Sequence, residues 1–109
     1  MPTTYKVLGQ SNPAATTATT LYTVPSATGT IVSTISVCNL SSVVGTFRVA
    51  IRPAGATLAN QHYLIYDSTL NGNDTITFTL GITLAATDVI TVFASSANFA
   101  FAAYGSEIS

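Results

Sequence analysis

Charge is the scarcest property of this 109-residue chain: charged residues make up 6% of it, against about 25% in ordinary soluble domains. Three Lys or Arg and four Asp or Glu give a net charge of -1 at pH 7. So few cations cannot neutralise a row of phosphates, which argues against nucleic acid as a partner. The same shortage argues against an anionic membrane surface. We therefore expect neither nucleic acid nor membrane among its partners.

Cysteine and long apolar runs are also missing. The one cysteine, Cys38, cannot form an internal disulfide, so the fold does not depend on an oxidising compartment. No stretch approaches the roughly 18 apolar residues of a membrane span. The first residues, Met-Pro-Thr-Thr-Tyr-Lys, lack the apolar run of a signal peptide. We expect synthesis in a cytoplasm without export.

Nucleophiles and metal ligands are equally few. Cys38 and His62 are the only cysteine and histidine, and neither lies in a recognisable catalytic motif. Cys38 ends an apolar segment, where cysteine behaves as a small buried hydrophobe. Transition-metal sites need several such ligands, and the remaining alternative is a calcium site in the loop 71–74.

The acidic residues give no catalytic pattern either. Asp67, Asp74 and Asp88 fall at expected strand ends or turns, where Asp commonly bonds nearby backbone amides. A glycosidase would need two carboxylates facing each other across a scissile bond. We predict a protein that is not an enzyme and that holds no cofactor and no metal.

Threonine, serine and alanine take the place of charge, and they alternate with larger apolar residues. In the segment 75–80, Ile76, Phe78 and Leu80 share one face while threonines take the other, which is the period of a half-buried strand. Eight short strands are expected, at 3–10, 18–24, 30–38, 46–52, 61–68, 75–80, 89–94 and 99–104. Strands at such intervals predict an all-β fold, an antiparallel β-sandwich of jelly-roll or immunoglobulin-like type.

The length allows one domain. Within it, residues 1–17 are expected to form an N-terminal strand or arm and residues 18–109 the β-sandwich. The segment 81–88 is expected to end one strand and turn into the next, and the alternative is a single helical turn at Ala85 and Ala86.

The clearest pattern lies in residues 30–52, which are predicted to form a β-hairpin around a loop of Ser, Asn and Gly. Ile31 and Ile35 are expected on a common inner side. Arg48 and Arg52, two of the three basic residues, are expected on the outer side of the second strand. They are candidate docking residues, and the alternative is that they only keep the protein soluble.

Aromatic residues supply the other candidate interface positions. Tyr63 and Tyr66 are expected on opposite faces of a strand that is covered on both sides. Together with Tyr22 and Tyr104 they offer an alternative role as a sugar-stacking surface.

The last strand carries a further pair of aromatics. Phe99 and Phe101 share one face, and the other face carries only Ala100 and Ala102, so another subunit could approach closely. The alternative is a tightly packed face of the same domain.

Two segments resemble a pattern seen in small virion proteins of tailed bacteriophages. One is Leu21-Tyr-Thr-Val-Pro25 followed by Gly29-Thr-Ile-Val-Ser-Thr-Ile-Ser-Val-Cys-Asn39. The other is Asn73-Asp-Thr-Ile-Thr-Phe-Thr-Leu-Gly-Ile-Thr-Leu-Ala-Ala-Thr-Asp-Val-Ile-Thr-Val92, followed by a Phe-rich closing strand. The resemblance spans most of residues 8–108 and implies a non-enzymatic β-sandwich that decorates or cements a capsid, or serves in a tail, neck or fibre. It brings no catalytic residues.

We therefore expect a structural protein located in the virion and made in the host cytoplasm. A surface with few charges does little to discourage association, so we expect a homotrimer that also contacts the phage major capsid protein or tail proteins. The alternative is a tail, neck or fibre component with a carbohydrate-binding role at the host receptor.

Overall fold

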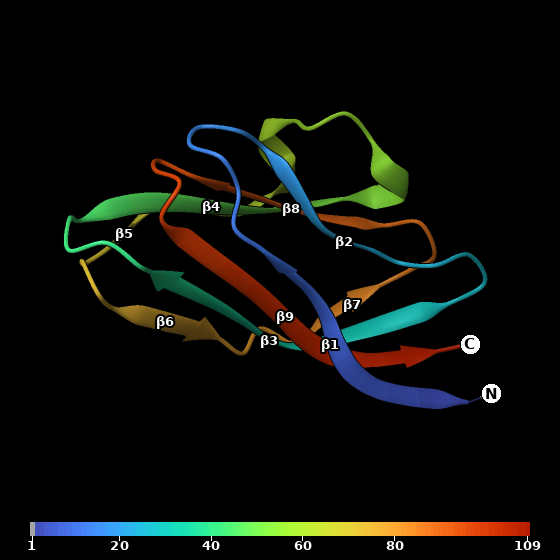
Figure 1. Cartoon of the computed structure of the whole chain (residues 1–109). Coiled ribbons are helices and arrows are strands. Elements are labelled where there is room, and N and C mark those ends of the chain that lie inside the picture. Colours follow the sequence, from blue (N-terminus) through green and yellow to red (C-terminus); the bar gives the residue numbers. More distant parts are fainter. Residues whose placement is uncertain (1) are drawn as a thin grey trace.

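The structure, a computed structural model, describes residues 2–109 as a sandwich of two antiparallel β-sheets (Figure 1). Alternation of threonine with Val, Ile and Phe favours strands because such side chains fill a pleated, half-buried surface. The strands are β1 (Thr3–Ser11), β2 (Thr19–Thr23), β3 (Gly29–Asn39), β4 (Gly45–Arg52), β5 (Tyr63–Leu70), β6 (Thr75–Phe78), β7 (Ile82–Leu84), β8 (Val89–Ala94) and β9 (Phe99–Ile108). Two short 3-10 turns, η1 (Pro53–Gly55) and η2 (Asn60–His62), lie between β4 and β5.

The strand order identifies the type of sandwich. Sheet A has the order β1-β9-β3-β6, with β7 also paired to β3, and sheet B has the order β2-β8-β4-β5. The first strand lies beside the last, and most connections cross from one sheet to the other. When β6 and β7 are counted as one interrupted strand, this is the order of an eight-stranded jelly roll. The all-β, antiparallel sandwich predicted from the sequence is confirmed, and the order selects the jelly roll over the immunoglobulin-like type.

The predicted hairpin at residues 30–52 is wrong, because β3 belongs to sheet A and β4 to sheet B. Residues 40–44 carry the chain between the sheets. Asn39, only 1% exposed, holds this crossover: its amide nitrogen donates to the carbonyl oxygens of Val43 and Leu70. Its side-chain oxygen accepts from the Ser41 amide. Alternation alone does not reveal such a crossover, since a strand shows the same pattern in either sheet.

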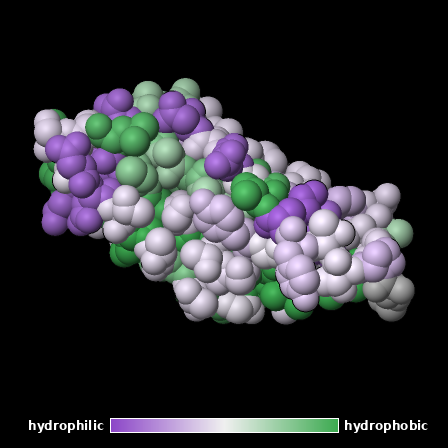
Figure 2. Space-filling model, turned by 60° about the horizontal axis from the view of Figure 1, so that its bottom comes forward, coloured by the Kyte–Doolittle hydropathy of each residue, from purple (hydrophilic) through white to green (hydrophobic). Residues whose placement is uncertain are grey.

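Residues 3–11 are a strand of the sandwich and not a free arm. β1 pairs with β9 from Thr3 to Ser11, and Leu8 points into the core. β1 is therefore an edge strand of sheet A. The outer side of this sheet, seen from below, is covered largely by weakly polar and apolar residues (Figure 2).

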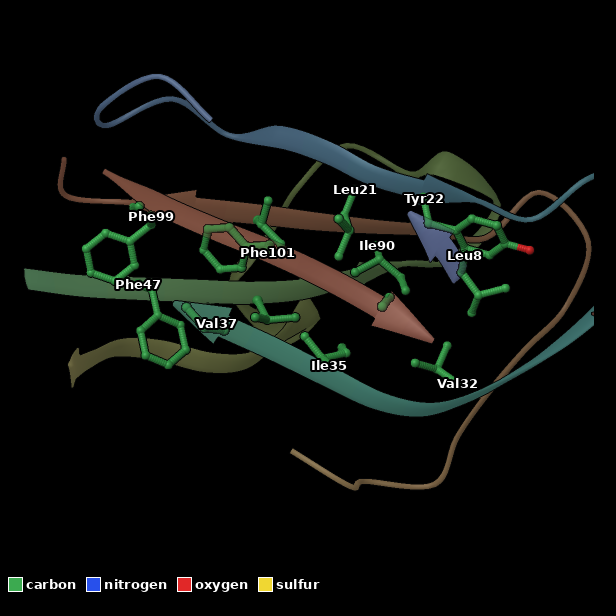
Figure 3. Packing of buried hydrophobic residues seen from close by; sticks show 14 of the residues in the cluster. Leu8, Leu21, Tyr22, Val32, Ile35, Val37, Phe47, Ile90, Phe99 and Phe101 are labelled. Carbon is green, nitrogen blue, oxygen red and sulfur yellow. The ribbon is translucent and has the colours of Figure 1, made fainter. Parts of the chain in front are cut away.

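The space between the sheets is filled by apolar side chains from both (Figure 3). The ring of Phe47 in sheet B lies 6.3 Å, centroid to centroid, from the rings of both Phe99 and Phe101 in sheet A. Phe99 is 0% and Phe101 2% exposed. These two residues, which we named as candidate interface positions, are core residues instead, and their neighbours Ala100 and Ala102 form the outer side of β9.

Local irregularities overturn two further sequence expectations and refine a third. A register shift between Val32 and Thr34 turns Ile31 outward, where it is 42% exposed, while Val32 and Ile35 stay inside. β6 ends at Phe78, so Leu80 lies beyond the strand and is exposed. The segment 81–88, expected to end one strand and turn into the next, holds a short strand of its own, β7, which pairs with β3, followed by the turn into β8.

Candidate functional site

The two outer faces of the sandwich differ in charge. On sheet A the strand register places outward the exposed aromatic and apolar residues Tyr5, Val7, Ile31 and Tyr104. Towards the other end the outward residues are small, namely Ser36, Cys38, Ala100 and Ala102, beside Thr75 and Thr77 of β6. Lys6 and Glu107, the charged residues of these strands, occupy the alternating positions and bond to each other at 3.2 Å. No outward residue on the strands of sheet A carries a charge, and we call this surface the neutral face.

Sheet B carries its charges on its outer face, beside aromatic rings. The guanidinium carbon of Arg48 lies 4.2 Å from the ring centroids of both Tyr66 and Phe93. Arg48 also binds Asp67 with two hydrogen bonds, Nε to Oδ1 at 2.6 Å and Nη2 to Oδ2 at 3.1 Å. These hydrogen bonds lower the pKa of Asp67 and raise that of Arg48. We call Arg48, Tyr63, Tyr66, Asp67 and Phe93 the aromatic cluster.

Irregular pairing of β5 with β4 builds this cluster. Phe47 lies opposite Ser68, Val49 opposite Ile65 and Ala50 opposite Tyr63, so β5 holds extra residues at two places. At one of them Asp67 adopts a positive φ of 51°, the left-handed region that Asp tolerates better than most residues. Bulges of this kind re-aim side chains.

Our prediction that the two tyrosines lie on opposite faces is therefore wrong. The rings of Tyr63 and Tyr66 are 4.9 Å apart, centroid to centroid, at an interplanar angle of 82°. Between them and Asn60 lies a hollow of about 490 Å³. The turn η2 positions Asn60, and His62 supports this turn by accepting a hydrogen bond at Nδ1 from the Ala59 amide.

Arg52, the other candidate docking residue, has a local role. Its Nη1 donates to the carbonyl oxygens of Gly55 and Ala56, and its Nε donates to Thr91 Oγ1. It thereby holds the segment 53–62, which lies over sheet B in Figure 1. Of the two arginines, the structure brings only Arg48 to the tyrosines.

The sequence candidates for catalysis and metal binding do not come together. Cys38 lies on the outer side of sheet A and His62 beside sheet B, with the sandwich between them. Asp88 accepts hydrogen bonds from the Ala54 and Ala85 amides, as expected of a turn carboxylate. Within residues 2–109 no group of three or more His, Cys, Asp or Glu is placed to hold a metal ion. In the same residues no helix has the length and apolar character of a membrane span.

The sequence analysis did not identify three residues of the site: Asn60, Phe93, and Asp67 in its role as the partner of Arg48. Their relation to the tyrosines depends on strand register and on the bulges, which alternation does not encode. The juxtaposition of Asp67 with two tyrosines in one strand was the only signal, and it is a weak one.

No protein-family model, curated protein or solved structure matches the chain.

Proposed function

We propose that the protein is a non-enzymatic structural subunit of a tailed-bacteriophage virion, acting as a homotrimer that decorates or cements the capsid. The observation that carries the proposal is the neutral face of sheet A. The buried centres of protein interfaces are depleted in charged residues, because a charge removed from water must be compensated. Ordinary soluble domains have no reason to keep a whole sheet face free of charge.

The neutral face has the form that a permanent contact needs. Tyr5 is 84% exposed, and Tyr104 lies on the same face, so two aromatic side chains are available at one end. The small residues Ser36, Ala100 and Ala102 at the other end allow close approach of a partner. The molecule measures 45 × 27 × 20 Å, which leaves room for the roughly 800 Å² per partner of a stable interface.

The edge strand β1 adds a second reason for assembly. Among residues 2–109, no strand pairs with the outer side of its nine residues, Thr3–Ser11, and Lys6 is its only charged residue. Proteins usually protect such an edge with charges, bulges or covering segments. β1 has one charge and one register shift, between Val7 and Gly9, so most of its length stays open to a partner. An assembled virion would cover β1 together with the neutral face.

Mass spectrometry of purified particles tests the proposal. Virions are prepared from the phage whose genome carries the gene and are banded on a density gradient. We expect the protein in many copies per particle, and immunogold labelling to place it on the capsid. Labelling confined to the tail would instead favour the tail, neck or fibre role, and absence from washed particles would contradict the proposal.

A further inference from the structure

The hollow beside Tyr63 and Tyr66 has the features of a small-molecule site on the face opposite the neutral face. It has a volume of about 490 Å³, is lined by Asn60, Tyr63 and Tyr66, and is wide open to solvent, so a ligand would lie against its walls with one side still in water. The two rings stand nearly perpendicular, at 82°, and form two walls of a corner. Tyr66 is 59% exposed, so its ring remains open to a ligand although it is fixed in place.

Arg48 fixes the ring of Tyr66 before any ligand arrives. The guanidinium lies over this ring and over Phe93, and two hydrogen bonds to Asp67 hold it there. Such a planar, delocalised cation stacks on aromatic rings in a way that an ammonium group cannot. A side chain that is already ordered loses less conformational entropy on binding, which favours affinity.

The chemistry of the walls selects the ligand. The tyrosine rings offer apolar surface, while the Asn60 amide and the phenol groups can donate and accept hydrogen bonds. The positive charge of Arg48 is matched by Asp67, so no unpaired charge of the cluster attracts an ion. A ligand that fits must be uncharged, apolar on its flat side and rich in hydroxyl groups at its rim.

We propose that this hollow binds a neutral saccharide, with one sugar ring stacked on Tyr66 and its edge against Tyr63. Asn60 bonds the hydroxyl groups at the rim. This site is independent of the assembly proposed above, since it lies on sheet B and the neutral face lies on sheet A.

The test uses neutral hexasaccharides of glucose, galactose, mannose and N-acetylglucosamine, each added separately to the full chain. Binding is followed by chemical shifts of the tyrosine rings in NMR spectra. We expect at least one of them to shift the signals of Tyr63 and Tyr66, and Tyr66→Ala to weaken that binding about tenfold. Tyr66→Phe keeps the ring and is expected to stay within about threefold of the parent protein.

Val43→Ala is the control, because Val43 is an exposed apolar residue of the 40–44 loop, outside both the aromatic cluster and the neutral face. It is expected to leave saccharide binding unchanged. A lack of shifts with all four hexasaccharides would overturn the proposal, and so would equal losses in Val43→Ala and Tyr66→Ala. Dissociation of an oligomer by Tyr66→Ala, without any saccharide binding, would assign the hollow to a protein contact and overturn it as well.

Discussion

Tyr22 and Glu107 join the two sheets at one end of the sandwich, where the phenol of Tyr22 donates a hydrogen bond of 2.5 Å to Oε2 of Glu107. The same phenol oxygen lies 2.9 Å from Thr30 Oγ1. Burial and the hydrogen bond to Glu107 raise the pKa of Tyr22 from 10.0 to about 12. The hydrogen bond from Tyr22, and then that from Lys6, lower the pKa of Glu107 below its ordinary value of 4.5.

These pKa shifts predict how stability depends on pH at both ends of the scale. The contribution of Glu107 is fully present above about pH 4.5 and is lost as the pH falls through its lower folded-state pKa. The contribution of Tyr22 is fully present below about pH 10 and is lost as the pH rises towards 12. Urea unfolding at a series of pH values measures the loss of stability at acid pH (the acid limb) and at alkaline pH (the alkaline limb).

Two substitutions test the hydrogen bond on which both contributions depend. Glu107→Gln is expected to flatten the acid limb and Tyr22→Phe the alkaline limb, relative to the parent protein. Each is also expected to reduce the other limb, because the Tyr22–Glu107 hydrogen bond contributes to both pKa shifts. Val43→Ala, at an exposed residue that carries no titratable group, serves as the control and is expected to change neither limb. Identical alkaline limbs for Tyr22→Phe and the parent protein would show that the phenol does not stabilise the sandwich.

Substitution of Asn39 is expected to lower stability more than substitution of most other polar residues. Its side chain forms hydrogen bonds with backbone groups of the β3–β4 crossover. Asn39→Ala leaves the buried carbonyl of Leu70 without this donor and frees residues 40–44. We expect a loss of about 2–3 kcal/mol in the free energy of unfolding, measured in urea. Asn98→Ala, at an exposed asparagine in the neighbouring loop, is the control and should cost less than about 0.5 kcal/mol. Equal losses for the two variants would refute this role.

Arg48→Lys tests whether the planar guanidinium orders the aromatic cluster. Lysine keeps the charge, but it cannot form two parallel hydrogen bonds to the Asp67 carboxylate and cannot stack between the rings of Tyr66 and Phe93. We expect the ring of Tyr66 to become mobile on the nanosecond scale in NMR relaxation, while the midpoint of urea unfolding changes little because the ion pair is exposed.

Arg52→Lys is the control for this experiment, because Arg52 bonds backbone carbonyls of the segment 53–62 and not the tyrosines. It is expected to leave the motion of Tyr66 unchanged. If the Tyr66 ring stays ordered in Arg48→Lys, the guanidinium of Arg48 is not what orders the aromatic cluster.

The fold class was predictable because the alternation of apolar and polar residues in this chain follows which side of each strand is buried. Segments such as 75–78 and 89–94 alternate or stay apolar according to which sides of the strand are covered. The sheet to which a strand belongs was not predictable. β3 and β4 follow each other with a short loop, as in a hairpin, yet Asn39 directs the loop across the sandwich.

The site was predictable only in part, because one extra residue in a strand reverses every face that follows it. Arg48, Tyr63 and Tyr66 stand out by residue type, but their contact depends on the bulges in β5. The same effect at Val32 and Thr34 turned Ile31 outward. Phe99 and Phe101 were assigned to an interface because a sequence does not say which of the two faces of a buried strand meets the core.

Sedimentation equilibrium of the parent protein beside Thr77→Lys and Thr69→Lys tests the proposed assembly most directly. Both threonines are exposed and outward on edge strands, Thr77 on the neutral face of sheet A and Thr69 on sheet B. If the neutral face is the trimer contact, the parent protein and Thr69→Lys sediment as trimers, and Thr77→Lys sediments as a monomer because its ammonium group would have to be desolvated. A parent protein that stays monomeric at every concentration, or a Thr77→Lys variant as trimeric as Thr69→Lys, would contradict the assignment of the neutral face.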